Sequence, residues 1–391
     1  MAKKGFLGYE RKDGSVGTRN DVLVLSTVLC TGPVPERIAE QVSGTVPMRY
    51  GWCFPRKETH EILKGVCTNP NVSGVLIIGL NCEGTNYITL ADEVAQTGKE
   101  CEVLEVRKQK GTVATIERGV EIAKYLVERG QQLKRTPCDV SRLIVGVKCG
   151  GSDTTSGLAA NPAVGEAVDS LIDADGTVIF SEPLEAVGAE HILSKRAINS
   201  EVAKQIQSMV IGSLSCYKPK KDGSLNLSGI IEERFMSPGN IHGGITTIEE
   251  KSLGAISKSG TRKICGTLKF AEQPRSKGLY FMDSIGHELT DVGVLFGFIA
   301  AGAQILVLTT GCGMATGTAL APLIKVCGNP ETYRYMRDNM DINAGTIITG
   351  RDSLGKVGDK IYKEIVDVAS GKLVKAEVLG YRDYEFSGVP T

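Results

Sequence analysis

Short runs of aliphatic and β-branched residues recur along the chain, separated by longer amphipathic stretches. These runs are apolar throughout rather than alternating, which is typical of strands covered on both faces of a parallel sheet. Strands are predicted at residues 21–28, 75–80, 101–106, 143–147, 177–182 and 305–310. Helices are predicted at residues 33–42, 58–67, 90–97, 113–129, 163–172 and 189–198. The alternation indicates an α/β fold of two or more doubly wound, mainly parallel sheet units, with the site at the carboxyl ends of strands.

The length of the chain suggests several domains. At 391 residues it exceeds what one hydrophobic core usually serves. Residues 137–142 (PCDVSR) are predicted as a linker. We expect an N-terminal α/β domain at residues 1–136, a central α/β domain at 137–250 and a C-terminal α/β domain at 251–391. The tail after Ala376 alternates loosely, which favours an edge strand or an extension.

Composition and charge narrow the class of protein. Hydrophobic residues make up 41% of the chain and charged residues 23%, as in ordinary globular proteins. Lysine plus arginine and aspartate plus glutamate number 45 each, without a long run of either sign. This balance argues against a nucleic-acid groove or an acidic-membrane surface. No stretch resembles a membrane span or the apolar region of a signal peptide, so we expect a cytoplasmic protein.

The chain is rich in cysteine for a cytoplasmic protein. It has eleven cysteines, and no two of them form a CxxC pair. An odd number scattered through a long chain predicts reduced thiols, some of which could bind metal. The missing CxxC spacing argues against a zinc ribbon or a thioredoxin-like site.

Three predicted strands share one kind of ending. VGVKCGGSD ends in Cys149 and Asp153, VLIIGLNCEG in Cys82 and Glu83, and ILVLTTGCGMATG carries Cys312 between two glycines. A single such turn is explained by a buried structural cysteine. Ligands of parallel sheets bind beyond the carboxyl ends of strands, however, so three endings suggest one crevice that holds a ligand or a metal.

Other loops carry candidate acid–base and binding groups. SEPLEAVGAEH places Glu182, Glu190 and His191 just after a strand, where metal ligation, acid–base chemistry and a structural histidine are all open readings. In the same stretch, helix capping is favoured for Glu185. SPGNIHGGITTIEEKSLG could hold a polar substrate, with Lys251 as a carboxylate clamp or base, or could be a surface loop followed by a helix.

The order of these motifs identifies a family resemblance. The segments GYERKDGSVGTRN, PNVSGVLIIGLNCE, KCGGSDTTSGLAANPAVG, EPLEAVGAEH, SPGNIHGGITTIEEKSLGA, GLYFMD, LTTGCG and NMDINAG span nearly the whole chain. In this order they resemble the altronate and galactarate dehydratase family, which includes the large subunit of (R)-sulfolactate sulfo-lyase. The resemblance implies a lyase dependent on iron or manganese that removes water or sulfite from a small anionic 2-hydroxy acid and leaves a 2-keto acid.

The resemblance also implies roles for individual residues. It suggests metal binding by cysteine and acidic side chains: Cys53, Cys149, Cys312, Glu83, Asp153, Glu190 and Asp341. Lys251, His242, Glu182 and His191 are the implied acid–base groups, and Asn161, Asn240, Thr246 and Thr247 the implied substrate ligands. Two alternatives stay open: an oxygen-sensitive hydro-lyase in which three cysteines hold a [4Fe–4S] cluster, and a noncatalytic binding subunit.

Two departures from the family pattern bear on partner and substrate. Full-length sugar-acid dehydratases carry a small N-terminal SAF-type domain ahead of this region, which implies a separate small SAF-type subunit here and an oligomeric assembly. In RYGWCFPRKE the family's His-Gly-x-Gly-Cys turn keeps only Cys53 and gains Arg49, Arg56 and Lys57. These cations would suit a dianionic substrate, although solvated surface cations are an equally good reading.

Overall fold

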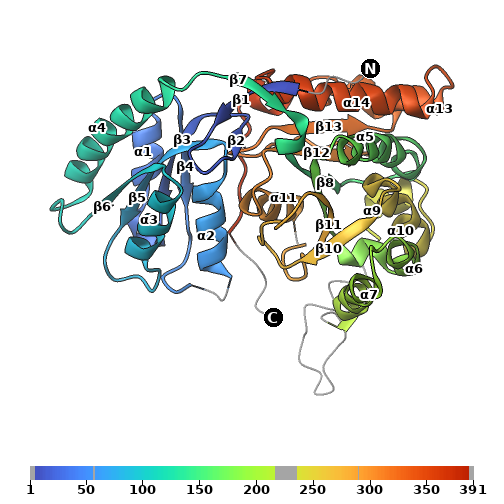
Figure 1. Ribbon diagram of the computed structural model, residues 1–391, viewed down its shortest axis with the longest axis horizontal. Helices are drawn as coiled ribbons and strands as arrows, with labels where there is room; N and C mark the ends of the chain where they lie inside the picture. The colour runs from blue at the N-terminus through green and yellow to red at the C-terminus, as the bar shows by residue number, and fades with distance from the viewer. Residues whose placement is uncertain (1–4, 56–57, 216–235, 289, 387–391) are drawn as a thin grey trace.

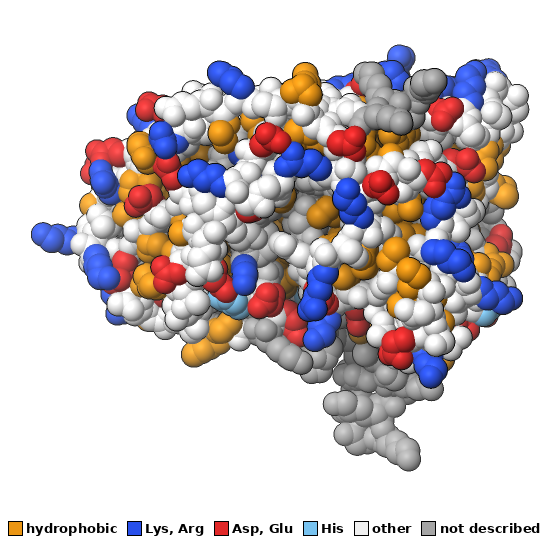
Figure 2. All heavy atoms as spheres, viewed as in Figure 1, with side chains coloured by type: hydrophobic (Ala, Val, Ile, Leu, Met, Phe, Trp, Pro, Cys, Tyr) orange, Lys and Arg blue, Asp and Glu red, His pale blue; other side chains and the backbone are white. Residues whose placement is uncertain are grey.

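The computed structural model describes residues 5–55, 58–215, 236–288 and 290–386. Its helices and strands form two lobes that lie side by side (Figure 1), with the N-terminal third of the chain in the smaller one. Basic and acidic side chains are interspersed over the face shown in Figure 2. No helix in the described ranges is long and apolar enough to cross a membrane.

The smaller lobe is a four-stranded parallel sheet in the order β4-β3-β5-β6. Its strands are β3 (Asp21–Ser26), β4 (Thr45–Arg49), β5 (Val72–Gly79) and β6 (Glu100–Glu105). Helices α1 (Val34–Ala39) and α4 (Thr112–Gln131) cover one face, and α2 (Thr59–Thr68) and α3 (Tyr87–Gln96) the other. Both faces are therefore buried, which explains the uninterrupted apolar runs in the sequence.

The larger lobe contains a seven-stranded parallel sheet in the order β10-β11-β9-β8-β12-β13-β14. Its strands are β8 (Ile144–Cys149), β9 (Thr177–Phe180), β10 (Ile264–Leu268), β11 (Gly278–Met282), β12 (Ile305–Thr310), β13 (Leu323–Cys327) and β14 (Ile342–Asn343). The α/β class expected from the sequence is confirmed. Strands β8 and β9, from residues 137–250, lie side by side in this one sheet, flanked on both sides by strands from residues 251–391, a segment that the sequence suggests as a separate domain.

Helices and short turns surround the larger sheet. Helix α14 (Leu354–Ala369) packs on α5 (Asn161–Asp173), and both contribute to the main core of this lobe. The remaining α-helices among the described residues are α6 (Glu190–Lys195), α7 (Ser200–Ser215), α9 (Pro238–His242), α10 (Ile248–Ile256), α11 (Asp291–Ala300), α12 (Pro330–Tyr335), α13 (Gly345–Ile348) and α15 (Lys375–Val378).

A small third sheet connects the lobes. It has the antiparallel order β2-β1-β7, with β1 (Gly5–Glu10), β2 (Val16–Gly17) and β7 (Thr136–Asp139). The linker expected at residues 137–142 therefore forms part of β7 and the 3-10 turn Val140–Arg142 instead. The PCDV segment looks like a linker in isolation, but its backbone pairs with the distant N-terminal strand.

The two lobes are packed tightly against each other. Helix α2 lies on α11, and a Cβ atom at Gly65 would stand 2.1 Å from the Ala300 carbonyl oxygen, so only glycine allows this approach. The Asn69 amide donates to the Ile299 carbonyl at 2.8 Å, and the Asn71 amide to the Gln304 carbonyl at 2.9 Å. Buried amides thus fix the relative position of the lobes.

The C-terminal tail runs along this junction. The sequence favours an edge strand or extension after Ala376, whereas the structure has the short helix α15 followed by irregular chain. The ring of Phe386 lies 5.9 Å from that of Tyr50, beyond β4, and 4.9 Å from that of Phe296 in α11. The partly buried aromatic residues of the tail pack against both lobes instead of extending a sheet.

Candidate active site

The carboxyl ends of β8 and β9 carry a buried ion network. Lys148 is part of the otherwise apolar strand β8, and its ammonium lies 2.5 Å from Glu182 Oε1. The same ammonium contacts Asp291, the first residue of α11, and donates to the Cys149 carbonyl at 2.8 Å. Only 4% of the Lys148 side chain is exposed. An ammonium this buried requires paired carboxylates, and two are present.

Two further lysines complete the network. The Lys258 ammonium lies 3.3 Å from Glu182 Oε2 and donates to the Cys149 sulfur at 3.2 Å. The Lys251 ammonium, on α10, lies 3.2 Å from Glu185 Oε1. We call these seven residues the lysine–carboxylate centre: Lys148, Cys149, Glu182, Glu185, Lys251, Lys258 and Asp291.

The three lysines of this centre are held in their charged form. Burial alone would lower the pKa of Lys148, but Asp291 and Glu182 raise it well above its ordinary value. Burial opposes the charge of Lys258 and Lys251 in the same way, and the surrounding thiol and carboxylates again raise the pKa of both. At neutral pH these groups are therefore fixed cations that can stabilise an anion but cannot accept a proton.

The two glutamates of the centre differ in proton affinity. Burial and the neighbouring Glu185 raise the pKa of Glu182. For Glu185, burial is outweighed by Lys251 and Lys258, and its pKa falls to about 2. Glu182 also has a φ of 80°, a left-handed conformation that is strained for non-glycine residues and clusters at functional sites. Carboxyl pairs whose pKa values are driven apart are typical of acid–base catalysis.

A third carboxyl group lies in the same electrostatic environment. Burial raises the pKa of Glu288 to about 8, and the charges of Glu182 and Glu185 act in the same direction. Glu288 Oε1 accepts from Ser284 at 2.6 Å, while Oε2 is buried without a hydrogen-bond partner among the described residues. A carboxyl that stays protonated at neutral pH can serve as a proton donor.

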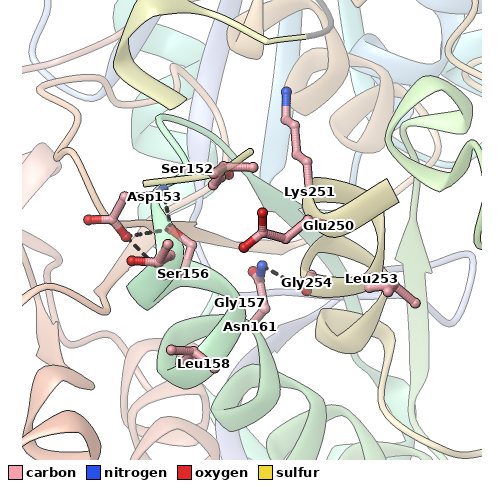
Figure 3. Close-up of a pocket in the computed structure, with 12 residues that line it drawn as sticks. Ser152, Asp153, Ser156, Gly157, Leu158, Asn161, Glu250, Lys251, Leu253 and Gly254 are labelled. Carbon is pink, nitrogen blue, oxygen red and sulfur yellow. Dashed lines mark hydrogen bonds between the residues drawn. The ribbon is translucent and has the colours of Figure 1, made fainter. Parts of the chain in front are cut away.

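A cavity of about 330 Å³ lies beside the centre (Figure 3). Its wall is formed by the turn after β8 and by α10, with Asp153, Ser156, Asn161 and Glu250 among the lining residues. Lys251 also lines it, and Figure 3 shows its side chain pointing away from Glu250, consistent with its ion pair to Glu185. This volume is within the usual range for a small-molecule site.

Both parts of the chain match models of one protein family. Residues 140–388 match the C-terminal domain of D-galactarate/altronate dehydratase, and residues 8–131 match the second domain of D-galactarate dehydratase/altronate hydrolase. The chain belongs to the galactarate/altronate dehydratase family. The expected resemblance is confirmed over nearly the full length.

Named relatives in this family are lyases of carbon–oxygen or carbon–sulfur bonds. The (2R)-sulfolactate sulfo-lyase subunit beta of Chromohalobacter salexigens is 36% identical over 98% of this chain and 98% of the relative. Galactarate dehydratase (L-threo-forming) of Escherichia coli is 34% identical over 94% of this chain and 73% of the relative. Altronate dehydratase of Bacillus subtilis is 33% identical over 97% of this chain and 76% of the relative.

The structure brings only some of the residues implied by the family together. Cys149, Glu182 and Lys251 all belong to the lysine–carboxylate centre. Asp153 lines the adjoining cavity, where it accepts from Ser156 and from the Asn329 amide at 3.0 Å.

Several predicted substrate ligands are already bonded within the protein. The Asn161 amide donates to the Gly254 carbonyl at 3.0 Å and its oxygen accepts at 2.5 Å from Thr309. Asn240 caps α9 and donates to the Ser152 carbonyl at 2.7 Å. Thr246 donates to Glu250 at 2.6 Å, and Thr247 caps α10. These contacts shape the cavity wall.

The other predicted site residues lie elsewhere. His242 is exposed at the end of α9, and Glu190 and His191 start α6, with no hydrogen bond or ion pair to the lysine–carboxylate centre among the described residues. Asp341 accepts from the backbone of Lys325 at 2.8 Å and of Lys375 at 2.9 Å.

Cys312 faces the Ser152 and Gly239 carbonyls at 3.8 and 3.7 Å. The smaller lobe holds Cys53, Glu83 and Arg49, whereas Arg56 and Lys57 fall outside the described residues.

The donor set of the centre can be tested against the iron or manganese that the family resemblance implies. Within the described ranges, one group of three potential ligands has its donor atoms within 4.8 Å of one another: Cys149, Glu182 and Glu185. Lys258 already bridges the thiol and Glu182, and Lys148 and Lys251 bind the other oxygens. A divalent ion here would meet three ammonium groups, so these residues do not fit one in this arrangement.

Sequence reasoning missed four charged members of this region. Lys148, Lys258, Asp291 and Glu288 were not among the expected site residues, and Glu185 was expected to cap a helix. In the structure Glu185 accepts instead from the Cys149 thiol at 2.8 Å and pairs with Lys251. The available signal was Lys148 itself, because a lysine inside an otherwise apolar strand requires buried anions.

Proposed function

We propose that the chain catalyses β-elimination from a small anionic 2-hydroxy acid. In this reaction the C2 proton is removed and a group leaves C3, which produces an enol that tautomerises to a 2-keto acid. The observation that carries the proposal is the lysine–carboxylate centre beside a cavity. It has three fixed cations, one carboxyl with a raised pKa and one with a lowered pKa. Such an arrangement can both hold an anion and move a proton.

The proposed chemistry uses the charges of the centre directly. Removing the C2 proton places negative charge on the substrate carboxylate and its neighbouring carbon. The Lys251, Lys258 and Lys148 ammoniums supply positive potential beside the cavity, and we propose that this potential stabilises the charge on that carboxylate. Preorganised cations in a buried site stabilise such charge without the cost of reorganising water.

Proton transfer is assigned to two carboxyls. Glu182, whose pKa is raised by burial and by Glu185, is proposed as the base at C2. Glu288, protonated at neutral pH, is proposed to protonate a departing hydroxyl so that it leaves as water. Sulfite leaves as a stable anion and needs no such proton, so Glu288 matters most if water is the leaving group.

The comparisons support two leaving groups. Identity of 36% to a sulfolactate sulfo-lyase subunit supports sulfite release with pyruvate as product, and 34% identity to a galactarate dehydratase supports water release. The designation "subunit beta" of the first relative also supports a second subunit. We propose a small SAF-type partner for this chain.

Parallel assays test the proposal. The chain is purified without oxygen, together with the small subunit, and offered altronate, galactarate and sulfolactate, while 2-keto acid and sulfite are measured separately. We expect 2-keto acid from at least one substrate, and sulfite in equal amount only from sulfolactate. Lys258→Met should abolish the product, whereas the exposed α10 control Glu249→Gln should retain it. Absence of product from all three substrates would refute the proposed function.

A further inference from the structure

The smaller lobe also presents functional groups at its carboxyl edge, and they are thiols. Cys30 lies in the 3-10 turn Leu29–Thr31 beyond β3, Cys53 follows β4 and Cys82 follows β5. These strands are neighbours in one parallel sheet, so their carboxyl ends open on the same side. All three cysteines are exposed and free. We call this set the thiol edge.

The three thiols lie near one another. Cys30 and Cys82 both lie close enough to Cys53 to act electrostatically on its thiol. The Gly84 amide donates to the Cys53 carbonyl at 2.9 Å, which holds the turn after β5 against the segment after β4. A Cβ atom at Gly84 would lie 2.7 Å from the Pro55 ring, so this close contact needs glycine.

The turn that carries Cys82 is rigid. The Glu83 carboxylate accepts from the backbone of Leu80 at 3.1 Å and of Cys82 at 2.9 Å, and from the Thr27 hydroxyl at 2.9 Å. Asn81 between them has a φ of 69°. The Glu83 carboxylate is therefore occupied by hydrogen bonds that hold the loop, whereas the three thiols are exposed. Ligands held by a structured shell are typical of built metal sites.

We propose that Cys30, Cys53 and Cys82 bind an iron–sulfur cluster through three thiolates, with one iron open to a further ligand. Each thiol loses its proton on ligation. A single tetrahedral ion needs its sulfur ligands closer together than the structure has them, because these three do not form a group within 4.8 Å among the described residues. In a cluster, bridging sulfides separate the metal atoms, so the thiolates can stand wider apart.

Apolar side chains flank the site. Leu29, Trp52 and Phe54, each next to one of the cysteines in sequence, are 49%, 48% and 78% exposed. Apolar surroundings limit solvent access and tune the potential of a bound cluster. The site is separate from the lysine–carboxylate centre, but the ring of Phe386 contacts both Tyr50, three residues before Cys53, and α11, which supplies Asp291.

The test measures binding rather than catalysis, so it is independent of the proposed function. The full chain is reconstituted anaerobically with equal amounts of ferrous and ferric iron and with sulfide, and iron, acid-labile sulfide and visible absorption are recorded. We expect about four iron and about four sulfide per chain. Cys30→Ser, Cys53→Ser and Cys82→Ser should each lower iron content several-fold. The matched control Cys265→Ser should retain it.

A second measurement uses the unmodified chain, in case a variant fails to fold. Reconstitution should protect Cys30, Cys53 and Cys82 from iodoacetamide, as mapped by mass spectrometry, and removal of iron by a chelator should restore their labelling. The proposal is overturned if iron binds without sulfide, if all three variants keep the cluster, or if a Cys30–Cys53 disulfide accounts for the protection.

Discussion

The two parallel sheets place opposite kinds of chemistry at the same topological position. At the carboxyl end of β8 and β9, charged groups are buried and neutralise one another, and the side chains of Lys148 and Lys258 are 4% and 2% exposed. At the carboxyl end of β3, β4 and β5 the functional groups are exposed thiols. In both lobes the ends of parallel strands place the functional groups. The degree of burial then determines whether these groups are paired charges or exposed thiols.

The difference shows why one edge is a completed site and the other an open one. The lysine–carboxylate centre holds its own counter-charges, so it is preorganised for an anion that develops during a reaction. The thiol edge instead presents soft, deprotonatable donors, which favour a metal. Each edge can therefore be broken separately.

The largest expected effect follows removal of one buried cation. Lys148→Met leaves Glu182 and Asp291 without their shared partner, and we expect a loss of about 3–5 kcal/mol in the free energy of unfolding. Lys325→Met is the matched control, since Lys325 is also buried in a strand but donates to the Thr316 carbonyl at 2.6 Å. This control should lose only about 1–3 kcal/mol. Equal losses in denaturant titrations would contradict the ion-pair account.

The second-largest expected effect is a loss of activity when the proposed base is removed. Glu182→Gln removes the proposed base, and kcat should fall by about 10²–10⁴. Because burial raises the pKa of Glu182, wild-type kcat/KM should fall as pH decreases through that raised pKa, where the base becomes protonated. This acidic limb should vanish in Glu182→Gln and persist in Glu249→Gln. Its persistence in the first variant would assign the titration to another group.

Much of the fold was predictable because it depends on local pattern. The strands expected at residues 75–80 and 143–147 are β5 (Val72–Gly79) and β8 (Ile144–Cys149), since an apolar run buried on both faces has few alternatives. The pairing of β7 with β1 could not be read from either segment, because it joins residues far apart in sequence. The mixed order of the larger sheet was hidden for the same reason.

The site was predictable only in part. Cys149, Glu182 and Lys251 were expected from strand endings and loop composition. Lys258 and Asp291 were not, because each lies on a helix or turn with no local signal and becomes functional only where the chain returns to β8. A sequence shows which residue types follow a strand, but not which distant charges neutralise them.

The rate of thiol labelling should differ directly between the two edges. In the iron-free chain, iodoacetamide should label Cys30, Cys53 and Cys82 readily, because they are exposed. Cys149 is fully buried, and burial together with Glu185 raises its pKa well above the ordinary value. Its labelling should be slower by about 10³ or more, since it requires unfolding. Rapid labelling of native Cys149 would contradict the buried centre.

The smallest effect concerns the protonated carboxyl near the centre. The pKa of Glu288 is raised to about 8 in the folded protein, against about 4.3 when unfolded. Below the unfolded pKa both states are protonated and no penalty exists. Between these values only the unfolded chain ionises, so this group lowers stability progressively as pH rises, and above about 8 the difference is constant.

Glu288→Gln removes that penalty while keeping a similar shape and a polar contact for Ser284. The variant should therefore melt at nearly the wild-type temperature at pH 4 and roughly 5 °C higher at pH 8. Glu331→Gln, an exposed carboxylate on α12, should show no comparable trend. A constant difference between Glu288→Gln and wild type across this range would mean that Glu288 is ionised in the fold, and would remove it as the proton donor to a departing hydroxyl.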